Sequence, residues 1–454
     1  MNVRCINPYD GSILQETPVW TARQLEDALV EVAGATPLWA STPLEARVDL
    51  LKRAAAVLRT RKQELAKLIS QEMGKLIGEA VAEIEKCAWV CEYYAEQAET
   101  FLADEIIETD ASRSLVAYLP IGTVLAVMPW NFPFWQVFRF AAPSLAAGNT
   151  AVLKHASNVP QCALAIEDTF KEAGFPKGVF RSLMISSAQT AKVIEDPRIQ
   201  AVTLTGSEPA GIAVASTAAR VIKKSVLELG GSDAFVVLED ADMDEAVKAA
   251  AASRYLNAGQ SCIAAKRFIV VERVADEFVQ RLKEAAEKLR PGHPLDSSTT
   301  LAPMARHDLR DELHQQVVDS IAKGARVVTG CMKEEGPGAF YQASILDHVA
   351  PGQRAYSEEF FGPVALVIRV SDEDEALRVA NDSRFGLAGS VWTQDSERGE
   401  RFARNIQSGA TFVNGMVKSD PRLPFGGVKA SGFGRELYRH GMHEFVNAKT
   451  LWIK

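Results

Sequence analysis

Short apolar runs alternate with helical stretches along the middle of this chain, and that order limits the fold more than any other feature of the sequence. Helical patterns cover residues 161–173 and 210–220. The runs typical of buried strands comprise residues 114–119, 122–129, 150–153, 200–204 and 234–238. Strands and helices in alternation require parallel strands joined by crossover helices. The sequence therefore predicts an α/β fold with a doubly wound parallel sheet.

A second alternation lies further along the chain and predicts a second α/β domain, beginning near Gly231. Its apolar runs comprise residues 266–271, 326–329, 365–368 and 410–414. Residues 21–100 carry apolar side chains at spacings of three and four, which is typical of helices that pack on another layer. A chain of 454 residues that is 47% hydrophobic can bury a large core and form two or three domains.

Charge and hydropathy exclude several classes of protein. The net charge of -8 argues against a protein that neutralises nucleic-acid phosphates, and the one short basic cluster, residues 59–62, lies in a helical pattern. The amino terminus lacks the apolar core and cleavage site of a signal peptide, and no window of about eighteen apolar residues occurs. We therefore expect a cytoplasmic protein without nucleic-acid or membrane partners.

The cysteines and histidines do not form a metal-binding pattern. Six cysteines are sparse for this length, so reduced thiols are expected. Cys87 and Cys91 lie four apart on one predicted helix face, where core packing is the better interpretation. His440 and His443 have no third ligand nearby in the sequence. No metal is expected.

Cys262 and Glu228 are the residues that suggest chemistry. Cys262 ends the run 257–262, and Glu228 precedes the diglycine 230–231. A thiolate attacks an electrophilic carbon, and a carboxylate can take the thiol proton or activate a water. The alternative is that Cys262 is a small buried hydrophobe and that Glu228 only ends a strand.

A nucleotide site is indicated by a turn rather than by a standard glycine-rich motif. The sequence contains no G-x-G-x-x-G run and no P-loop. Gly206 and Ser207 lie between a predicted strand and a predicted helix, where free backbone N–H groups and the helix dipole suit a pyrophosphate. Glycine and serine are also common in such turns for geometric reasons alone.

Seven motifs in a fixed order resolve this ambiguity. They are residues 129–133, Lys154, and residues 205–207, 228–231, 259–262, 359–363 and 424–432. In this order they resemble the aldehyde dehydrogenase superfamily, and in particular the short-form succinate-semialdehyde dehydrogenases. The resemblance implies an NAD(P)-binding domain of residues 1–101 and 121–230 and a catalytic domain of residues 231–430. It also implies a small β oligomerisation flap of residues 102–120 and 440–454, and hence a homodimer or homotetramer.

The resemblance implies a role for each catalytic residue. Cys262 would attack the aldehyde carbon to give a thiohemiacetal, whose oxyanion accepts hydrogen bonds from the Asn131 amide and the Cys262 backbone N–H. After hydride transfer to the nicotinamide, Glu228 would activate the water that hydrolyses the thioester. The alternative role for Asn131 is that of a turn residue.

The matching cofactor positions follow from the same resemblance. They are Trp130, Lys154, Ser157, Gly206, Ser207, Glu359 and Phe361. Lys154 and Glu359 would hold the two riboses, although either could be a solvated surface charge. Many NAD-preferring relatives have a glutamate where this chain has Ser157. Since a carboxylate there would repel a 2'-phosphate, the sequence predicts NADP as cofactor without excluding NAD.

The substrate prediction depends on Arg139, which lies eight residues after Asn131. The resemblance places it where succinate-semialdehyde enzymes hold the distal carboxylate, and its alternative role is a structural ion pair. A second arginine of those enzymes is here Leu256, so we expect Ser419 or Arg422 to supply the missing donor. The predicted reaction is oxidation of succinate semialdehyde to succinate, with another small semialdehyde or an uncharged aldehyde as the alternative.

Two other classes of protein remain possible at this point. A non-catalytic binding or structural protein with this fold would be favoured if Cys262, Glu228 or Asn131 were replaced, and all three are present. A thioester-forming reductase, or a relative that passes the acyl group to coenzyme A, would not need the base, so Glu228 favours hydrolysis. Glu436 matches a family carboxylate that could relay protons or serve as the structural partner of a lysine.

Overall fold

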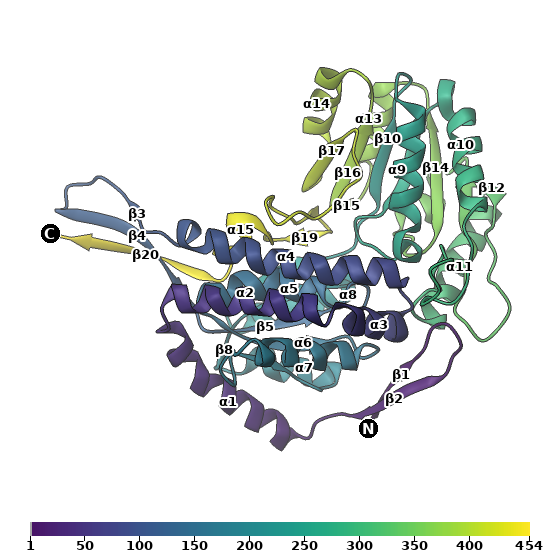
Figure 1. Ribbon diagram of the computed structural model, residues 1–454. Coiled ribbons are helices and arrows are strands. Elements are labelled where there is room, and N and C mark those ends of the chain that lie inside the picture. The colour runs from purple at the N-terminus through teal and green to yellow at the C-terminus, as the bar shows by residue number, and fades with distance from the viewer. Residues whose placement is uncertain (1) are drawn as a thin grey trace.

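The computed structural model describes residues 2–454, and it has two helix-covered sheets with a narrow β arm (Figure 1). The first sheet has the strand order β19-β9-β8-β5-β6-β7. Its strands are β5 (Thr123–Met128), β6 (Thr150–His155), β7 (Phe180–Ser182), β8 (Ile199–Thr205), β9 (Lys224–Glu228) and β19 (Gly432–Phe433). All neighbours are parallel except β19, which pairs antiparallel with β9.

Helices cover both faces of this sheet because its central strands are apolar on both sides. Val124 and Ala126 of β5 face one core with helices α2 (Leu44–Thr60), α3 (Lys62–Met73), α4 (Ile77–Phe101), α5 (Trp135–Ala146) and α6 (Pro160–Glu172). Leu125 faces the opposite core with helices α1 (Ala22–Ala40), α7 (Ser187–Glu195) and α8 (Glu208–Arg220). Successive strand residues point to opposite faces, so a continuous apolar run is buried on both.

The second sheet has the order β12-β13-β14-β11-β10-β16-β17 and lies in the upper right of Figure 1. Its strands are β10 (Asp233–Val237), β11 (Ala265–Val271), β12 (Arg326–Thr329), β13 (Ser344–Asp347), β14 (Val364–Val370), β16 (Ala388–Trp392) and β17 (Ala410–Val413). Phe235 and Val237 face one core with α9 (Met243–Tyr255) and α10 (Glu272–Glu287). Val236 faces the other core, with α11 (His307–Ala322), α13 (Glu373–Asn381) and α14 (Ser396–Asn405).

The β arm projects away from both sheets on the left of Figure 1. It consists of β20 (Val446–Ile453), β4 (Arg113–Pro120) and β3 (Glu105–Ile106), all paired antiparallel. Ile106, Leu119, Trp452 and Ile453 leave large apolar side chains exposed on this arm. The chain also begins with a hairpin of β1 (Asn2–Ile6) and β2 (Ile13–Pro18).

The predicted fold of two parallel-sheet α/β parts with a small β element is confirmed. One detail differs, because an edge strand of each sheet, β12 and β19, is antiparallel to its neighbour. An edge strand needs no crossover helix, so it can return in either direction. No helix in residues 2–454 has the length and apolarity needed to cross a membrane.

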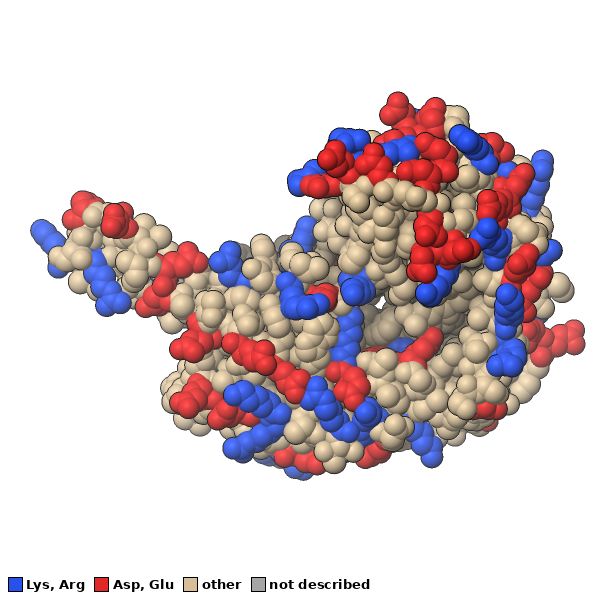
Figure 2. Space-filling model, turned by 45° about the horizontal axis from the view of Figure 1, so that its top comes forward, with Lys and Arg blue, Asp and Glu red and all other residues tan. Residues whose placement is uncertain are grey.

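A hollow separates the two sheet-containing parts, and basic and acidic side chains are intermingled around it (Figure 2). The carboxyl ends of the parallel strands β5, β8 and β9 carry residues that line a cavity in this region, among them Pro129, Thr205 and Glu228. In open α/β sheets, ligands bind beyond the carboxyl ends of the strands. The position of this cavity therefore makes it the candidate ligand-binding site.

Candidate active site

Cys262 lies where two cavities meet. The first, of about 290 Å³, is lined by turns of the first sheet and by α11. The second, of about 240 Å³, is lined by α4, α5 and the loop 416–419. Cys262 and Gln136 line both cavities. A half-buried thiol at this junction can meet one ligand from each side.

The loop that precedes Cys262 has an unusual backbone. Asn257 and Ala258 both have φ of +52°, and Gly259 has φ of +74°. The fully buried Arg254 donates to the carbonyl oxygens of Gly259 at 2.5 Å and Ala265 at 3.0 Å, so it holds both ends of the loop. A Cβ atom on Gly259 would collide with the Gly362 carbonyl oxygen. Glycine is therefore required three residues before the cysteine.

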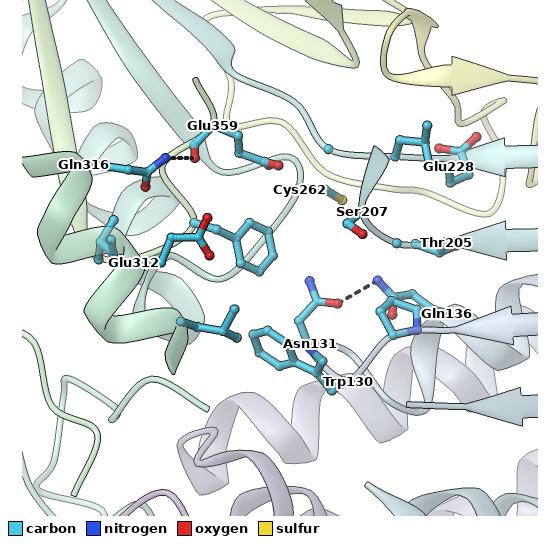
Figure 3. A pocket seen from close by; sticks show the side chains of 17 residues that line it. Trp130, Asn131, Gln136, Thr205, Ser207, Glu228, Cys262, Glu312, Gln316 and Glu359 are labelled. Atoms are coloured by element: carbon cyan, nitrogen blue, oxygen red, sulfur yellow. Dashed lines mark hydrogen bonds between the residues drawn. The ribbon is translucent and has the colours of Figure 1, made fainter. Parts of the chain in front are cut away.

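The side-chain amide of Asn131 is fixed with its nitrogen towards this loop. Its Nδ2 donates to the Gln260 carbonyl oxygen at 3.0 Å, and its Oδ1 accepts from Gln136 Nε2 at 3.1 Å (Figure 3). The backbone carbonyl of Asn131 accepts from Lys75 Nζ at 2.8 Å and from Asn257 Nδ2 at 2.9 Å. An amide nitrogen carries two hydrogens, so Asn131 has one more to donate.

Burial favours the protonated form of the Cys262 thiol. It raises the pKa of Cys262 to about 12, although the positive charges of Arg139 and Lys266 act in the opposite direction. Because the thiolate is the nucleophile, the site needs a base that can accept this proton.

Glu228 has the properties of such a base. It ends β9, lines the first cavity and is buried (Figure 3). Neither of its carboxylate oxygens has a hydrogen-bond partner within residues 2–454. Burial, together with the nearby Glu436 carboxylate, raises the pKa of Glu228 well above its ordinary value. A carboxylate with a raised pKa and free lone pairs is suited to accept a proton.

Arg139 and Glu436 form a buried ion pair beside Glu228. Arg139 also donates to Thr205 Oγ1 at 3.3 Å, and its guanidinium lies 4.6 Å from the centre of the Phe425 ring. The same arginine lines the second cavity. The structure thus contains the ion pair that the sequence left open as the alternative role of Arg139, and the partner of Glu436 is this arginine rather than a lysine.

Glu359 lies against the diglycine that follows Glu228. Its Oε1 accepts from the Gly231 backbone N–H at 3.1 Å and pairs with Lys266 Nζ at 3.2 Å. A Cβ atom on Gly230 would overlap the Glu359 carboxylate, so a larger residue there would displace this carboxylate from its present position. Lys266 also donates to the carbonyl oxygens of Ser261 at 3.0 Å and Cys262 at 2.7 Å.

The predicted cofactor residues fall into two groups. Trp130, Gly206, Ser207, Glu359 and Phe361 line the first cavity together, and the rings of Trp130 and Phe361 meet edge to face at 5.9 Å. The side chain of Ser207 makes no capping bond, so the backbone N–H groups at the start of α8 can bind an anion.

Lys154 and Ser157 lie apart from that lining, at and just beyond the end of β6. Lys154 is buried, and this burial lowers the pKa of its ammonium group. Ser157 is exposed. The two lie three residues apart in the sequence, one a buried cation and the other an exposed hydroxyl.

The second cavity contains Ser419 but not Arg422. Ser419 Oγ accepts from Lys86 Nζ at 2.8 Å and from Trp135 Nε1 at 3.1 Å. Arg422 instead pairs with Asp420 at 2.7 Å and is absent from the cavity lining. Of the two residues expected to supply the missing donor, Ser419 lines the cavity and Arg422 does not.

Several residues of the site were not identified from the sequence. Gln136 orients Asn131, Lys266 joins Glu359 to the cysteine loop, and Lys86 lies on the wall of the second cavity. Of these three residues, Lys266 was the one that the sequence could have indicated, because it lies four residues after Cys262. His443 binds the Phe101 carbonyl oxygen at 2.6 Å, and no metal-binding group of acidic, histidine and cysteine residues occurs within residues 2–454.

A cysteine between two cavities, with an amide donor and a buried carboxylate close by, defines an enzyme that uses a thiol nucleophile on a nucleotide-binding fold. The comparisons with known proteins identify the family. The model of the aldehyde dehydrogenase family matches residues 1–451. The chain belongs to the aldehyde dehydrogenase family.

The similar proteins cover the whole chain. A probable NADP-dependent succinate-semialdehyde dehydrogenase of Synechocystis sp. is 52% identical over 454 residues, covering 100% of both chains. The succinate semialdehyde dehydrogenase Sad of Escherichia coli, which uses NAD or NADP, is 46% identical and covers 98% of this chain and 97% of its own. The crystal structure of succinic semialdehyde dehydrogenase from Streptococcus pyogenes with NADP superposes with a TM-score of 0.98, at 38% identity and 99% coverage of both chains.

Proposed function

We propose that this protein oxidises succinate semialdehyde to succinate with NADP as the electron acceptor. The observation that carries the proposal is the position of Cys262, between a nucleotide-type cavity and a second cavity that contains basic side chains. The names of the similar proteins from Synechocystis sp. and Escherichia coli support this substrate.

The residues present fit a bound NADP. Trp130, Phe361 and Glu359 line the cavity beside Cys262, and the start of α8 at Gly206 and Ser207 offers N–H groups to the pyrophosphate. We assign the adenosine ribose and its 2'-phosphate to Lys154 and Ser157, since a buried lysine without a carboxylate partner within residues 2–454 favours an added anion. NADP held by these residues would supply the acceptor for the hydride of the substrate carbon.

We assign the chemical steps to Cys262, Glu228 and Asn131. Glu228 accepts the Cys262 proton, and the thiolate sulfur attacks the aldehyde carbon. The resulting oxyanion accepts hydrogen bonds from Asn131 Nδ2 and the Cys262 backbone N–H, each typically worth about 3 kcal/mol. After the carbon has lost its hydride, Glu228 releases its first proton to solvent and is again a carboxylate. It then removes a proton from water, and the hydroxide oxygen adds to the thioester carbon. The carbon–sulfur bond breaks to release the acid, and the departing thiolate takes the proton from Glu228.

We place the substrate in the second cavity, with Arg139 and Ser419 as substrate-binding residues. Arg139 contributes positive potential there, and Ser419 contributes a hydroxyl. The arm of β3, β4 and β20, which belongs to the flap of residues 102–120 and 440–454, would pair with a second copy of the chain. Its exposed apolar residues support a homo-oligomer.

The test is steady-state reduction of NADP and NAD with succinate semialdehyde and with butanal, an uncharged aldehyde of the same chain length. The proposal expects kcat/KM for succinate semialdehyde with NADP to exceed that for butanal by at least tenfold. Equal values for the two aldehydes would contradict the substrate assignment and leave the family assignment unchanged.

A further inference from the structure

The second cavity has four basic residues in its lining, and two of them are already paired. Lys75 forms a buried ion pair with Glu83 and donates to the Asn131 carbonyl oxygen. Arg139 forms its ion pair with Glu436. Lys418 is exposed at the rim. A charge that already has a buried partner attracts a further anion weakly, so Lys75 and Arg139 are poor candidates for the main anchor of a carboxylate.

Lys86 is the fourth basic residue, and it has no carboxylate partner. No acidic oxygen within residues 2–454 lies within ion-pair distance of its ammonium group, although most of the side chain is enclosed between α4, α5 and the loop 416–419. Its Nζ lies 4.2 Å from the centre of the Trp135 ring and donates to Ser419 Oγ at 2.8 Å. A partly buried cation held only by a ring face and a hydroxyl retains two N–H groups for an anion.

Ser419 is aligned by the same two residues. Its oxygen accepts from Lys86 Nζ and from Trp135 Nε1 at 3.1 Å, which uses both lone pairs. The hydroxyl hydrogen is then directed to a third partner. Lys86 and Ser419 together present adjacent donors on the wall of the cavity that Cys262 also lines.

We propose that Lys86, together with Ser419, binds the distal carboxylate of the substrate and so sets the preference for aldehydes that end in an acid group. This inference rests on the proposed function and names the residue responsible for it. The lysine supplies the charge, the serine supplies a second hydrogen bond, and Trp135 fixes the direction of both. Arg139 then has mainly the task of compensating Glu436.

The electrostatic surroundings of Lys86 agree with this role. Burial, and then the charge of Arg139, lower the pKa of Lys86 to about 8, and the groups that act in the opposite direction are Cys87, Asp420 and Glu83. A bound carboxylate would offset that burial and restore the charged form. An anionic ligand would therefore stabilise the charged form of Lys86.

The experiment compares kcat/KM for succinate semialdehyde and for butanal in the purified wild type and in three variants. Lys86→Met keeps the length of the side chain and removes the charge, and Lys86→Arg keeps the charge. Lys67→Met is the matched control, because it removes an exposed lysine on α3 outside both cavities. A charge-assisted hydrogen bond corresponds to a loss of about 10- to 100-fold in kcat/KM for the charged aldehyde in Lys86→Met.

The expected result is that this loss spares butanal, whose kcat/KM stays within about twofold, and that Lys86→Arg keeps most of the preference. Activity with butanal also shows that the variant is folded. If Lys86→Met does not fold, Lys86→Gln takes its place. A wild type without any preference would overturn the proposed function and this inference together. A wild type whose preference survives Lys86→Met, with a normal KM for succinate semialdehyde, would overturn this inference alone.

Discussion

Arg139 and Glu436 form a buried ion pair that links the wall of the second cavity to the neighbourhood of Glu228. Arg139 lies on α5 and Glu436 lies near the carboxyl terminus, almost three hundred residues further along the chain. The arginine counteracts the burial that raises the pKa of both carboxyl groups. Its charge therefore supports the base as well as the substrate.

Arg139→Met should accordingly reduce kcat with both aldehydes, by about tenfold or more, since a shift of one pKa unit in the base is about 1.4 kcal/mol. A smaller additional loss should affect only succinate semialdehyde. Measurement of kcat against pH should show the rising limb displaced to higher pH. If only the charged aldehyde were affected, Arg139 would be a simple substrate anchor and Lys86 would not be needed.

The same substitution should reduce stability in a pH-dependent way. Suppose that a carboxyl group has a higher pKa in the folded protein than in the unfolded chain. The free energy of unfolding then decreases as the pH rises from the unfolded pKa to the folded pKa. Removing Arg139 raises the folded pKa of Glu436 further. In the variant, the free energy of unfolding should therefore keep decreasing with pH beyond the pH at which it levels off in the wild type. Urea unfolding at pH 6 and pH 9 tests this. A loss of about 3 kcal/mol at pH 9, and less at pH 6, is expected; an equal loss at both would contradict the argument.

The single-turnover rate of the wild type should increase with pH because of Cys262 and Glu228. Both act in the deprotonated form, and burial raises the pKa of each. The single-turnover rate with butanal should therefore rise steadily between pH 6 and pH 10. Glu228→Gln should reduce turnover by about 100-fold or more. A rate that is independent of pH over this range would show that neither proton transfer limits the reaction.

The charged aldehyde should behave differently above pH 8. Lys86 loses its proton in that range, since its pKa is lowered to about 8. With succinate semialdehyde, kcat/KM should stop rising near that pH, while with butanal it continues to rise. The charged and titratable groups around the lysine are Glu83 and Cys87 of α4, Arg139 of α5, and Lys418 and Asp420 of the loop. Lys86→Arg should keep the preference for succinate semialdehyde but make kcat/KM for both aldehydes depend on pH in the same way, because arginine stays protonated.

The main strands could be predicted from the sequence because their apolar runs are long and buried on both faces. The runs that became β5, β8 and β10 are examples. Two strands of the second sheet, β13 and β16, were not identified. They are short, and Ser344, Gly389 and Ser390 interrupt their hydrophobic pattern.

The catalytic and cofactor positions could be proposed because they lie in local motifs, whereas the network around them depends on the folded chain. The pairing of β19 with β9 brings the carboxy-terminal segment to the end of β9, near Glu228. In the sequence, Lys86 was one charge among many on a helix of largely buried residues. Only the packing of α4 against Trp135 and Ser419 shows that it faces a cavity.

Cofactor preference should depend on Ser157. Ser157→Glu places a carboxylate beside the site that we assign to the 2'-phosphate, so the KM for NADP should rise by about tenfold or more, about 1.4 kcal/mol, while the KM for NAD stays the same or falls. Ser157→Ala is the matched control, because it removes the hydroxyl without adding charge, and it should raise the KM for NADP only a few-fold. An unchanged preference in Ser157→Glu would place the 2'-phosphate elsewhere.

Gly259 should be essential for the shape of the catalytic loop. Its φ of +74° and its contacts with Gly362 and Arg254 leave no room for a methyl group. Gly259→Ala should therefore destabilise the fold by about 2 kcal/mol or more and abolish most activity. Gly34→Ala is the matched control, because Gly34 lies within α1 with open space around it, and there alanine should stabilise by up to about 1 kcal/mol. Thermal unfolding and kcat with butanal measure both effects, and a fully active, stable Gly259→Ala would mean that the loop can form without the left-handed glycine.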